Sequence, residues 1–218
     1  MVDNKTRAGR NRTLTVSEEE ASHLKKQILY SKDLPSNTDL IDRIINGDIF
    51  DVIQYIPDGI ADLIIVDPPY NLSKDFNSSK FSAMSKEKYM DYIRSWLNLV
   101  CRKLKHNGTL YMCGDWKCSA AQQQVIEEEL TILNRITWQR EKGRGASSNW
   151  KNAMEDIWFA VKNKNEYYFN VEAVKMKRKV IAPYRENGIP KDWEATKDGN
   201  FRITCPSNFW DINRRWIK

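Results

Sequence analysis

Four consecutive residues, Asp67-Pro68-Pro69-Tyr70, supply the groups needed to hold a flat base by its amino group. A carboxylate and a proline-linked carbonyl can accept both hydrogens of an exocyclic amine. The prolines lack N–H groups and fix their own φ angles, and each restricts the preceding residue to extended geometry. The ring of Tyr70 offers a stacking face, worth about 1–3 kcal/mol per base in single-strand binders. Such a grip leaves the amine nitrogen better placed to attack an electrophilic methyl group.

The elements before this motif place it where a ligand would bind. Leu63 to Val66 is a short apolar run rich in β-branched residues, which predicts a buried strand of a parallel sheet. Ligands of open α/β sheets bind just beyond the carboxyl ends of the strands, and Asp67 lies there. The simpler interpretation of these four residues is that they only form a rigid turn after a strand. Their position at the carboxyl end of the strand favours a binding role instead.

Helical and strand patterns alternate along the rest of the chain, which predicts an α/β fold. The pattern indicates a capped N-terminal helix from Ser17 to about Tyr30 and a helix opened by Ser85. Further elements are expected, strands or short helices, over residues 44–50, 51–55, 109–113, 120–130, 133–139 and 156–161. We expect an extension over residues 1–40, a catalytic α/β region over 41–170 and a partial target-recognition segment over 171–218.

Several stretches resemble, in order, those of the amino-methylating DNA methyltransferases of restriction-modification systems, in which the catalytic motif precedes the cofactor motif. The matching stretches are Ile45–Asp51, Asp67–Leu72, Asn107–Met112, Ile136–Trp138 and Glu155–Ala160. The resemblance covers roughly residues 44 to 170. It implies a Rossmann-like, mostly parallel sheet of the class I methyltransferase type.

The same resemblance implies chemistry and site residues. It implies that Asp67, Pro68, Pro69 and Tyr70 are catalytic, and that Asp48 and Ile49, with Asp67, help to bind S-adenosylmethionine. An acidic turn that caps residues 51–55 is an equally good interpretation of Asp48. The family's cytosine-amine enzymes usually begin this motif with Ser, so Asp67 favours adenine in double-stranded DNA as the substrate.

The sequence departs from the family pattern in its glycines. Related proteins carry a glycine-rich loop that cradles the methyl donor, whereas the only Gly-x-Gly here is Gly143-Arg144-Gly145 in a polar stretch. We therefore expect a fold incomplete at its C-terminal cofactor half, with that loop supplied by a missing half or a second polypeptide. The Gly-x-Gly stretch is interpreted as a loop near DNA.

Charge and its distribution suit a polyanionic partner. Lys and Arg number 35 against 29 Asp and Glu, which gives a formal charge of +6. Two basic clusters lie in stretches expected near DNA, and from them we predict that Lys142, Arg144, Lys177 and Arg178 contact nucleic acid. A solvated charged surface is the alternative for each cluster.

Cysteine and histidine usage argues against a metal site. The four cysteines, Cys101, Cys113, Cys118 and Cys205, form no Cys-x-x-Cys pair, and the only histidines are His23 and His106. We expect no metal and free, largely buried thiols. No apolar run approaches membrane-spanning length, and the first residues lack a signal-peptide core, so a cytoplasmic location without membrane contact is expected.

Three alternatives to adenine methylation in DNA remain open. The same grip fits the exocyclic amine of cytosine, and it fits an amine of an RNA base. A non-catalytic DNA-binding subunit or remnant is the third alternative, and it belongs to a different functional class.

Overall fold

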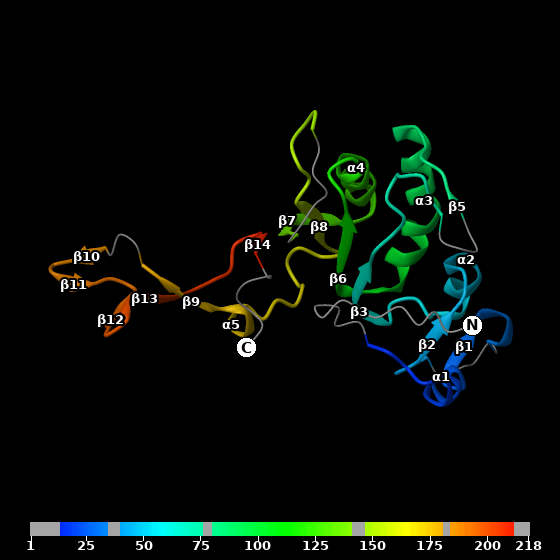
Figure 1. The fold of residues 1–218 in the computed structure, drawn as a ribbon, viewed down its shortest axis with the longest axis horizontal. Helices are drawn as coiled ribbons and strands as arrows, with labels where there is room; N and C mark the ends of the chain where they lie inside the picture. Colours follow the sequence, from blue (N-terminus) through cyan, green and yellow to red (C-terminus); the bar gives the residue numbers. More distant parts are fainter. Residues whose placement is uncertain (1–13, 35–39, 76–79, 141–146, 181–183, 212–218) are drawn as a thin grey trace. The chain divides into compact units, whose positions relative to one another are not determined.

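A computed structural model describes residues 14–34, 40–75, 80–140, 147–180 and 184–211 of the chain. The chain divides into two compact units, Met1–Ile56 and Pro57–Lys218. Figure 1 shows the order of their elements along the sequence.

The first unit contains a parallel strand pair and short helices. Its elements are α1 (Glu18–Lys25), β1 (Ile28–Tyr30), η1 (Ser31–Asp33), β2 (Ile44–Asn46), α2 (Ile49–Val52) and η2 (Ile53–Tyr55). The predicted capping box is present, because Ser17 Oγ accepts from Glu20 N and Ser17 N donates to Glu20 Oε2. The helix is shorter than predicted: it ends at Lys25, and Ile28–Tyr30 pairs with β2 as a strand.

The second unit is organised around a five-stranded sheet in the order β14-β7-β8-β6-β3. Its strands are β3 (Ala61–Val66), β6 (Leu104–Gly114), β7 (Thr131–Gln139), β8 (Met154–Val161) and β14 (Phe209–Trp210). The pairs β3·β6 and β14·β7 are parallel, whereas β8 runs antiparallel to both of its neighbours. Four of the five strands therefore share one direction, and the α/β class with a mostly parallel sheet is confirmed.

Strand β3, which leads into the Asp67 motif, differs from the prediction in its burial. It is parallel to β6 as expected, but it lies at the edge of the sheet. Leu63 is 52% exposed and Ile65 is 67% exposed, so the prediction of a buried strand is wrong. The exposed Leu63 and Ile65 alternate with the half-buried Ile64 and Val66, so one face of this edge strand is exposed although it is apolar.

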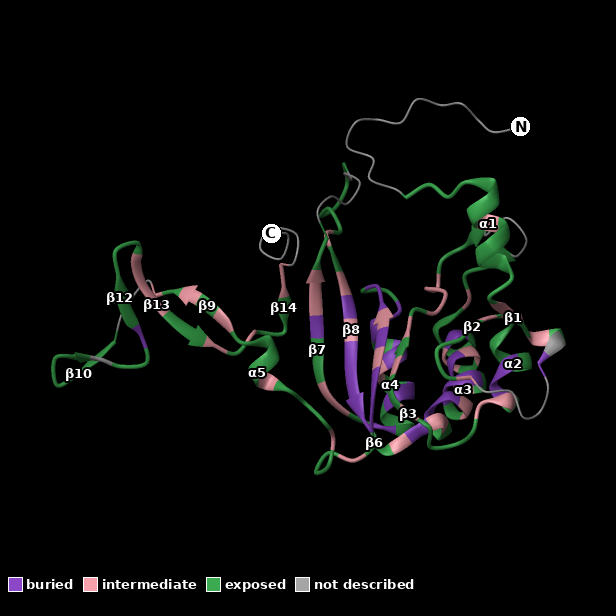
Figure 2. Cartoon of the chain, turned by 90° about the horizontal axis from the view of Figure 1, so that it is seen from below, coloured by how far each residue is buried: buried purple, intermediate pink, exposed green. Residues whose placement is uncertain are grey.

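Two helices, α3 (Lys86–Lys103) and α4 (Ser119–Glu129), pack together and against the sheet. Ser85 caps α3 as predicted, with its Oγ accepting from Lys88 N at 3.3 Å. The fully buried side chains gather at this helix-sheet layer, and they include Ile93, Leu97, Leu110 and Met112. Figure 2 shows burial concentrated in these elements and in β8, whereas α1 is exposed along its length.

The remaining elements of the second unit are short. They are β4 (Lys74–Asp75), β5 (Lys80–Phe81), α5 (Val171–Val174), β9 (Met176–Lys179), β10 (Arg185–Glu186), β11 (Ile189–Pro190), β12 (Glu194–Thr196) and β13 (Gly199–Thr204). Strands β12, β13 and β9 form a separate antiparallel sheet, and β4 pairs with β5. Among the residues described, no helix combines the length and the apolar character needed to cross a membrane.

Close packing at the end of β6 gives a test of the fold. Gln122 of α4 is fully buried, and its Nε2 donates to the Cys113 carbonyl at 3.0 Å. A Cβ added at Gly114 would lie 2.7 Å from Gln122 Cδ. Gly114→Ala must therefore displace this side chain, and we expect the free energy of unfolding in urea to fall by about 1–3 kcal/mol.

Gly59→Ala is the matched comparison, because nothing lies within 4 Å of a Cβ built there. Any decrease in the free energy of unfolding of Gly59→Ala comes from the positive φ of 67° at this residue and not from crowding. An unchanged unfolding free energy for Gly114→Ala would contradict the packing described for β6 and α4.

Candidate active site

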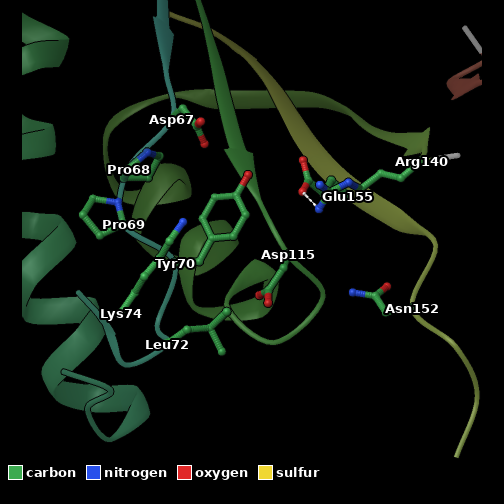
Figure 3. Close-up of a pocket in the computed structure, with 10 residues that line it drawn as sticks. All are labelled: Asp67, Pro68, Pro69, Tyr70, Leu72, Lys74, Asp115, Arg140, Asn152 and Glu155. Carbon is green, nitrogen blue, oxygen red and sulfur yellow. Dashed lines mark hydrogen bonds and ion pairs between the residues drawn. The ribbon is translucent and has the colours of Figure 1, made fainter. Parts of the chain in front are cut away.

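A cavity of about 590 Å³ opens at the carboxyl end of β3. Its walls come from the motif after β3, the hairpin that follows, the end of β6, and the ends of β7 and β8 (Figure 3). The lining residues are Asp67, Pro68, Pro69, Tyr70, Leu72, Lys74, Asp115, Arg140, Asn152 and Glu155. All four predicted catalytic residues are therefore brought into one pocket.

Tyr70 and Asp67 meet at one end of this pocket. In Figure 3 the Tyr70 hydroxyl points toward the end of the pocket formed by Asp67 and Glu155. The pKa of Tyr70 is raised by burial, by the negative charges of Glu155 and Asp67, and by a hydrogen bond with Asp67. Tyr70 thus stays protonated, and the carboxylate of Asp67 retains further lone pairs for another donor.

The two proline carbonyls of the motif have different partners. The Pro69 carbonyl accepts from the Tyr89 hydroxyl at 3.0 Å, and Tyr89 is a fully buried residue of α3. The Pro68 carbonyl accepts no hydrogen bond from any residue that the structure describes. Of the two, the Pro68 carbonyl is the one that remains free to accept from a ligand.

The segment after the motif is closed by an amide clamp. Asn71 Nδ2 donates to the Met84 carbonyl, and Met84 N donates to Asn71 Oδ1, each at 2.8 Å. Ser73 Oγ accepts from Ala83 N at 3.1 Å, next to the β4·β5 pair. These contacts fasten the stretch that carries Leu72 and Lys74 to the start of α3.

An ion pair forms the opposite wall. Arg140 Nη1 lies 2.5 Å from Glu155 Oε1, and the Glu155 side chain is only 15% exposed. Sequence reasoning missed both residues, as it missed Asn152, because β7 and β8 were not recognised as antiparallel partners. The available signal was the polar stretch between the two strands, whose ends pair as Gln139 with Met154.

Asp115 and Trp116 both follow β6, and only the first of them lines the cavity. Asp115 lines the cavity and is 8% exposed, but its Oδ1 accepts from the N–H groups of Lys117 and Cys118, both at 3.0 Å. It therefore anchors the start of α4. Trp116 is 61% exposed and does not line the cavity.

The other predicted site residues lie elsewhere. Asp48 and Ile49 belong to the first unit, where Asp48 Oδ1 accepts from Phe50 N at 2.9 Å and caps α2. The capping interpretation of Asp48 is therefore observed, and the cofactor role stays a prediction. Lys142 and Arg144 lie outside the described residues.

Lys177 and Arg178 are neighbours on β9, so their side chains point to opposite faces of the small sheet. Lys177 lies over the Phe201 ring, with Nζ 4.9 Å from its centroid. Arg178 pairs directly with Arg202 of β13 across the sheet. Two guanidinium groups thus share one face, and no described carboxylate forms an ion pair with either of them.

The cysteines are free thiols in the structure. Cys101 and Cys118 are buried, and burial raises the pKa of each to about 12. Cys113 is half-buried and Cys205 is exposed. Within the described part of the chain, no group of three His, Cys, Asp or Glu side chains is arranged to hold a metal ion.

Comparison with known proteins finds relatives among DNA methyltransferases. A family model described as DNA methylase matches residues 61–216. The chain is 27% identical to Type II methyltransferase M.HpaI of Haemophilus parainfluenzae over 78% of its own length and 50% of that protein. It is 28% identical to DNA adenine methyltransferase YhdJ of Escherichia coli (strain K12), over 78% of this chain and 57% of that protein.

The chain therefore spans about half the length of the curated relatives that it matches. Among solved structures, a complex of M1.HpyAVI with SAM aligns with a TM-score of 0.43 and 18% identity, over 66% of this chain and 59% of that chain.

The Asn71 clamp gives a testable consequence for the pocket wall. Asn71→Ala removes both hydrogen bonds to Met84 and should release the hairpin without unfolding the sheet. If the two lost hydrogen bonds lower the local stability by about 1.4 kcal/mol, the fraction of molecules in which the hairpin is detached from the start of α3 rises about tenfold. We expect trypsin to cleave after Lys74 and Lys80 about tenfold faster than in the unmodified chain.

Asn98→Ala is the control. Asn98 of α3 donates a hydrogen bond from its Nδ2 to Glu129 Oε1 of α4, away from the hairpin. Equal cleavage rates in the two variants would show that Asn71 does not fasten this segment.

Proposed function

The chain belongs to the DNA methylase family, and from this membership we propose that it methylates the exocyclic amine of adenine in double-stranded DNA, with S-adenosylmethionine as the methyl donor. The observation that carries the proposal is the set of acceptors at the end of β3. Asp67, Pro68 and Tyr70, which carry a carboxylate, a carbonyl and an aromatic ring, line one cavity of about 590 Å³. An amine with two hydrogens and a planar ring matches these groups.

The residues of the pocket act on the base in defined ways. Asp67 and the Pro68 carbonyl accept the two amine hydrogens, which reduces delocalisation of the nitrogen lone pair into the ring. The base first leaves the duplex, which costs a few kcal/mol of unstacking free energy. The base then stacks against the Tyr70 ring. The new N–C bond would form as the S–CH3 bond of the donor breaks, with the electron pair of that bond left on the sulfur. The surplus proton then leaves the nitrogen through its hydrogen bond to Asp67 and passes to water.

S-adenosylmethionine supplies a methyl group on a positively charged sulfur. The carboxylate of Asp67 suits such a cation, because a nearby opposite charge stabilises it. Asp48 and Ile49 remain proposed contacts of the donor. We also propose that a glycine-rich segment beyond these 218 residues, in the same or a second polypeptide, completes its site.

Adenine is proposed over cytosine for two reasons. The motif begins with Asp67, and the cytosine-amine enzymes that it resembles usually begin with Ser. One relative is named as a DNA adenine methyltransferase. We also propose that the protein is located in the cytoplasm.

Replacing Asp67 tests the proposal directly. Asp67→Ala removes one of the two amine acceptors, and positioned acid-base groups contribute about 100-fold or more to rate. We expect methyl transfer to adenine in duplex DNA to fall at least about 100-fold, with DNA affinity unchanged. Transfer is measured by mass spectrometry of nucleosides after incubation with isotope-labelled S-adenosylmethionine.

Asp91→Ala is the control, since Asp91 is an exposed carboxylate that pairs with Arg94 on α3. Retained activity in Asp67→Ala would overturn the mechanism. Label in N4-methylcytosine, or in RNA alone, would replace adenine in DNA as the substrate. Binding of DNA without any transfer would favour a non-catalytic subunit.

The arginine pair on the small sheet supports DNA as the partner. Arg178 and Arg202 lie directly opposite each other, and like charges in that position destabilise a strand pair. Guanidinium groups bind phosphates with two parallel hydrogen bonds, so a phosphate between them would relieve the repulsion. We propose that this face binds the phosphate backbone and that the face with Lys177 does not.

Neighbouring substitutions on β9 distinguish the two faces. Arg178→Gln with Arg202→Gln should raise the Kd for a DNA duplex about tenfold and reduce the salt dependence of binding by about one to two ions. Lys177→Gln removes one charge from the opposite face and should change the Kd no more than about twofold. Binding is measured by fluorescence anisotropy over a series of salt concentrations, and a loss of affinity in the double arginine variant no larger than that in Lys177→Gln would contradict the assignment.

A further inference from the structure

Among the backbone torsions from ψ of Asp67 to ψ of Pro69, the covalent structure of the motif leaves one free. The rings of Pro68 and Pro69 fix both proline φ angles. Asp67 and Pro68 each precede a proline, so their ψ angles are restricted to the extended range. Only ψ of Pro69 lacks such a restraint, because Tyr70 follows it. This torsion sets the direction in which Tyr70 leaves the motif.

A buried hydroxyl holds that torsion. Tyr89 is 0% exposed, and its hydroxyl donates to the Pro69 carbonyl at 3.0 Å. Burial is the main cause that raises the pKa of Tyr89, so the hydroxyl keeps its proton and stays a donor. Breaking this bond would leave the Pro69 carbonyl unpaired beside the buried face of α3, which costs free energy. The hydrogen bond therefore restrains ψ of Pro69. Rotation about ψ of Pro69 would break it.

We propose that Tyr89 is a positioning residue for the methyl transfer: its bond to the Pro69 carbonyl fixes the backbone direction from which the Tyr70 side chain extends, and leaves the Pro68 carbonyl for the amine. Tyr89 does not line the cavity, so it acts through Tyr70 and not on the base. The inference rests on the proposed function for its catalytic consequence. Its structural part concerns the chain alone.

Further contacts make α3 a rigid support for this bond. The Tyr89 ring stacks near Tyr92, with ring centroids 6.1 Å apart. The Asn71 clamp to Met84 holds the chain on the other side of Tyr70, immediately before the Ser85 cap of α3. Tyr70 is thus held from both sides by the first turns of one helix.

Tyr89→Phe removes one oxygen atom and keeps the buried ring. We expect amide hydrogen exchange at Tyr70, Asn71 and Leu72 to accelerate at least about fivefold, because one restraining hydrogen bond is lost. We expect kcat for methyl transfer to fall between about 10- and 100-fold, as for other misplaced groups. The KM for DNA should change less than twofold, since the DNA-binding face of the small sheet is untouched.

Val100→Ala is the control for loss of helix packing. Val100 is 5% exposed on the same helix, three turns beyond Tyr89. It should lower the unfolding temperature without changing exchange at residues 70–72 or kcat. Unchanged exchange at Tyr70 to Leu72 in Tyr89→Phe, or an equal acceleration in Val100→Ala, would overturn the inference.

The two measurements separate this inference from the proposed function. If the unmodified chain transfers no methyl group, the proposed function fails, and the exchange of residues 70–72 still decides the role of Tyr89. If the chain is active and Tyr89→Phe keeps both its exchange pattern and its kcat, the inference fails alone.

Discussion

The site depends on how the backbone ends β3 with two prolines. Neither Pro68 nor Pro69 can donate a hydrogen bond, and each restricts the residue before it, so the sheet cannot continue through them. The carbonyls that remain must find donors or face a ligand. Tyr89 satisfies the Pro69 carbonyl from within the core, and Pro68, whose carbonyl has no partner among the described residues, lines the cavity. The start of α3 and the path of the chain into the hairpin are tied to that contact.

The second constraint is the direction of β8. Because β8 runs antiparallel between β6 and β7, its first residues lie at the same sheet edge as the carboxyl ends of β3 and β6. Glu155 therefore faces the motif across the cavity, and Arg140 at the end of β7 pairs with it. One reversed strand thus completes a pocket that parallel strands alone would leave open on that side.

Local features were predictable from the sequence where local chemistry decides them. The caps at Ser17 and Ser85, the helices they begin, and the strands on either side of α4 follow from residue type and periodicity. The grouping of Asp67 to Tyr70 at a strand end followed from the rule for α/β sheets. The exposed edge position of β3, the Tyr89 contact and the Arg140–Glu155 wall were not predictable, because each depends on which strands pair and in which direction. A period of two residues gives no information about strand order.

The central claim is that Asp67 and the Pro68 carbonyl together hold the amine of a base. A crystal structure of the chain with duplex DNA and an unreactive analogue of S-adenosylmethionine measures this directly. We expect the exocyclic nitrogen of an extrahelical adenine to lie within about 2.7–3.2 Å of both an Asp67 carboxylate oxygen and the Pro68 oxygen. An amine directed away from these two oxygens, or a base bound outside this cavity, would contradict it.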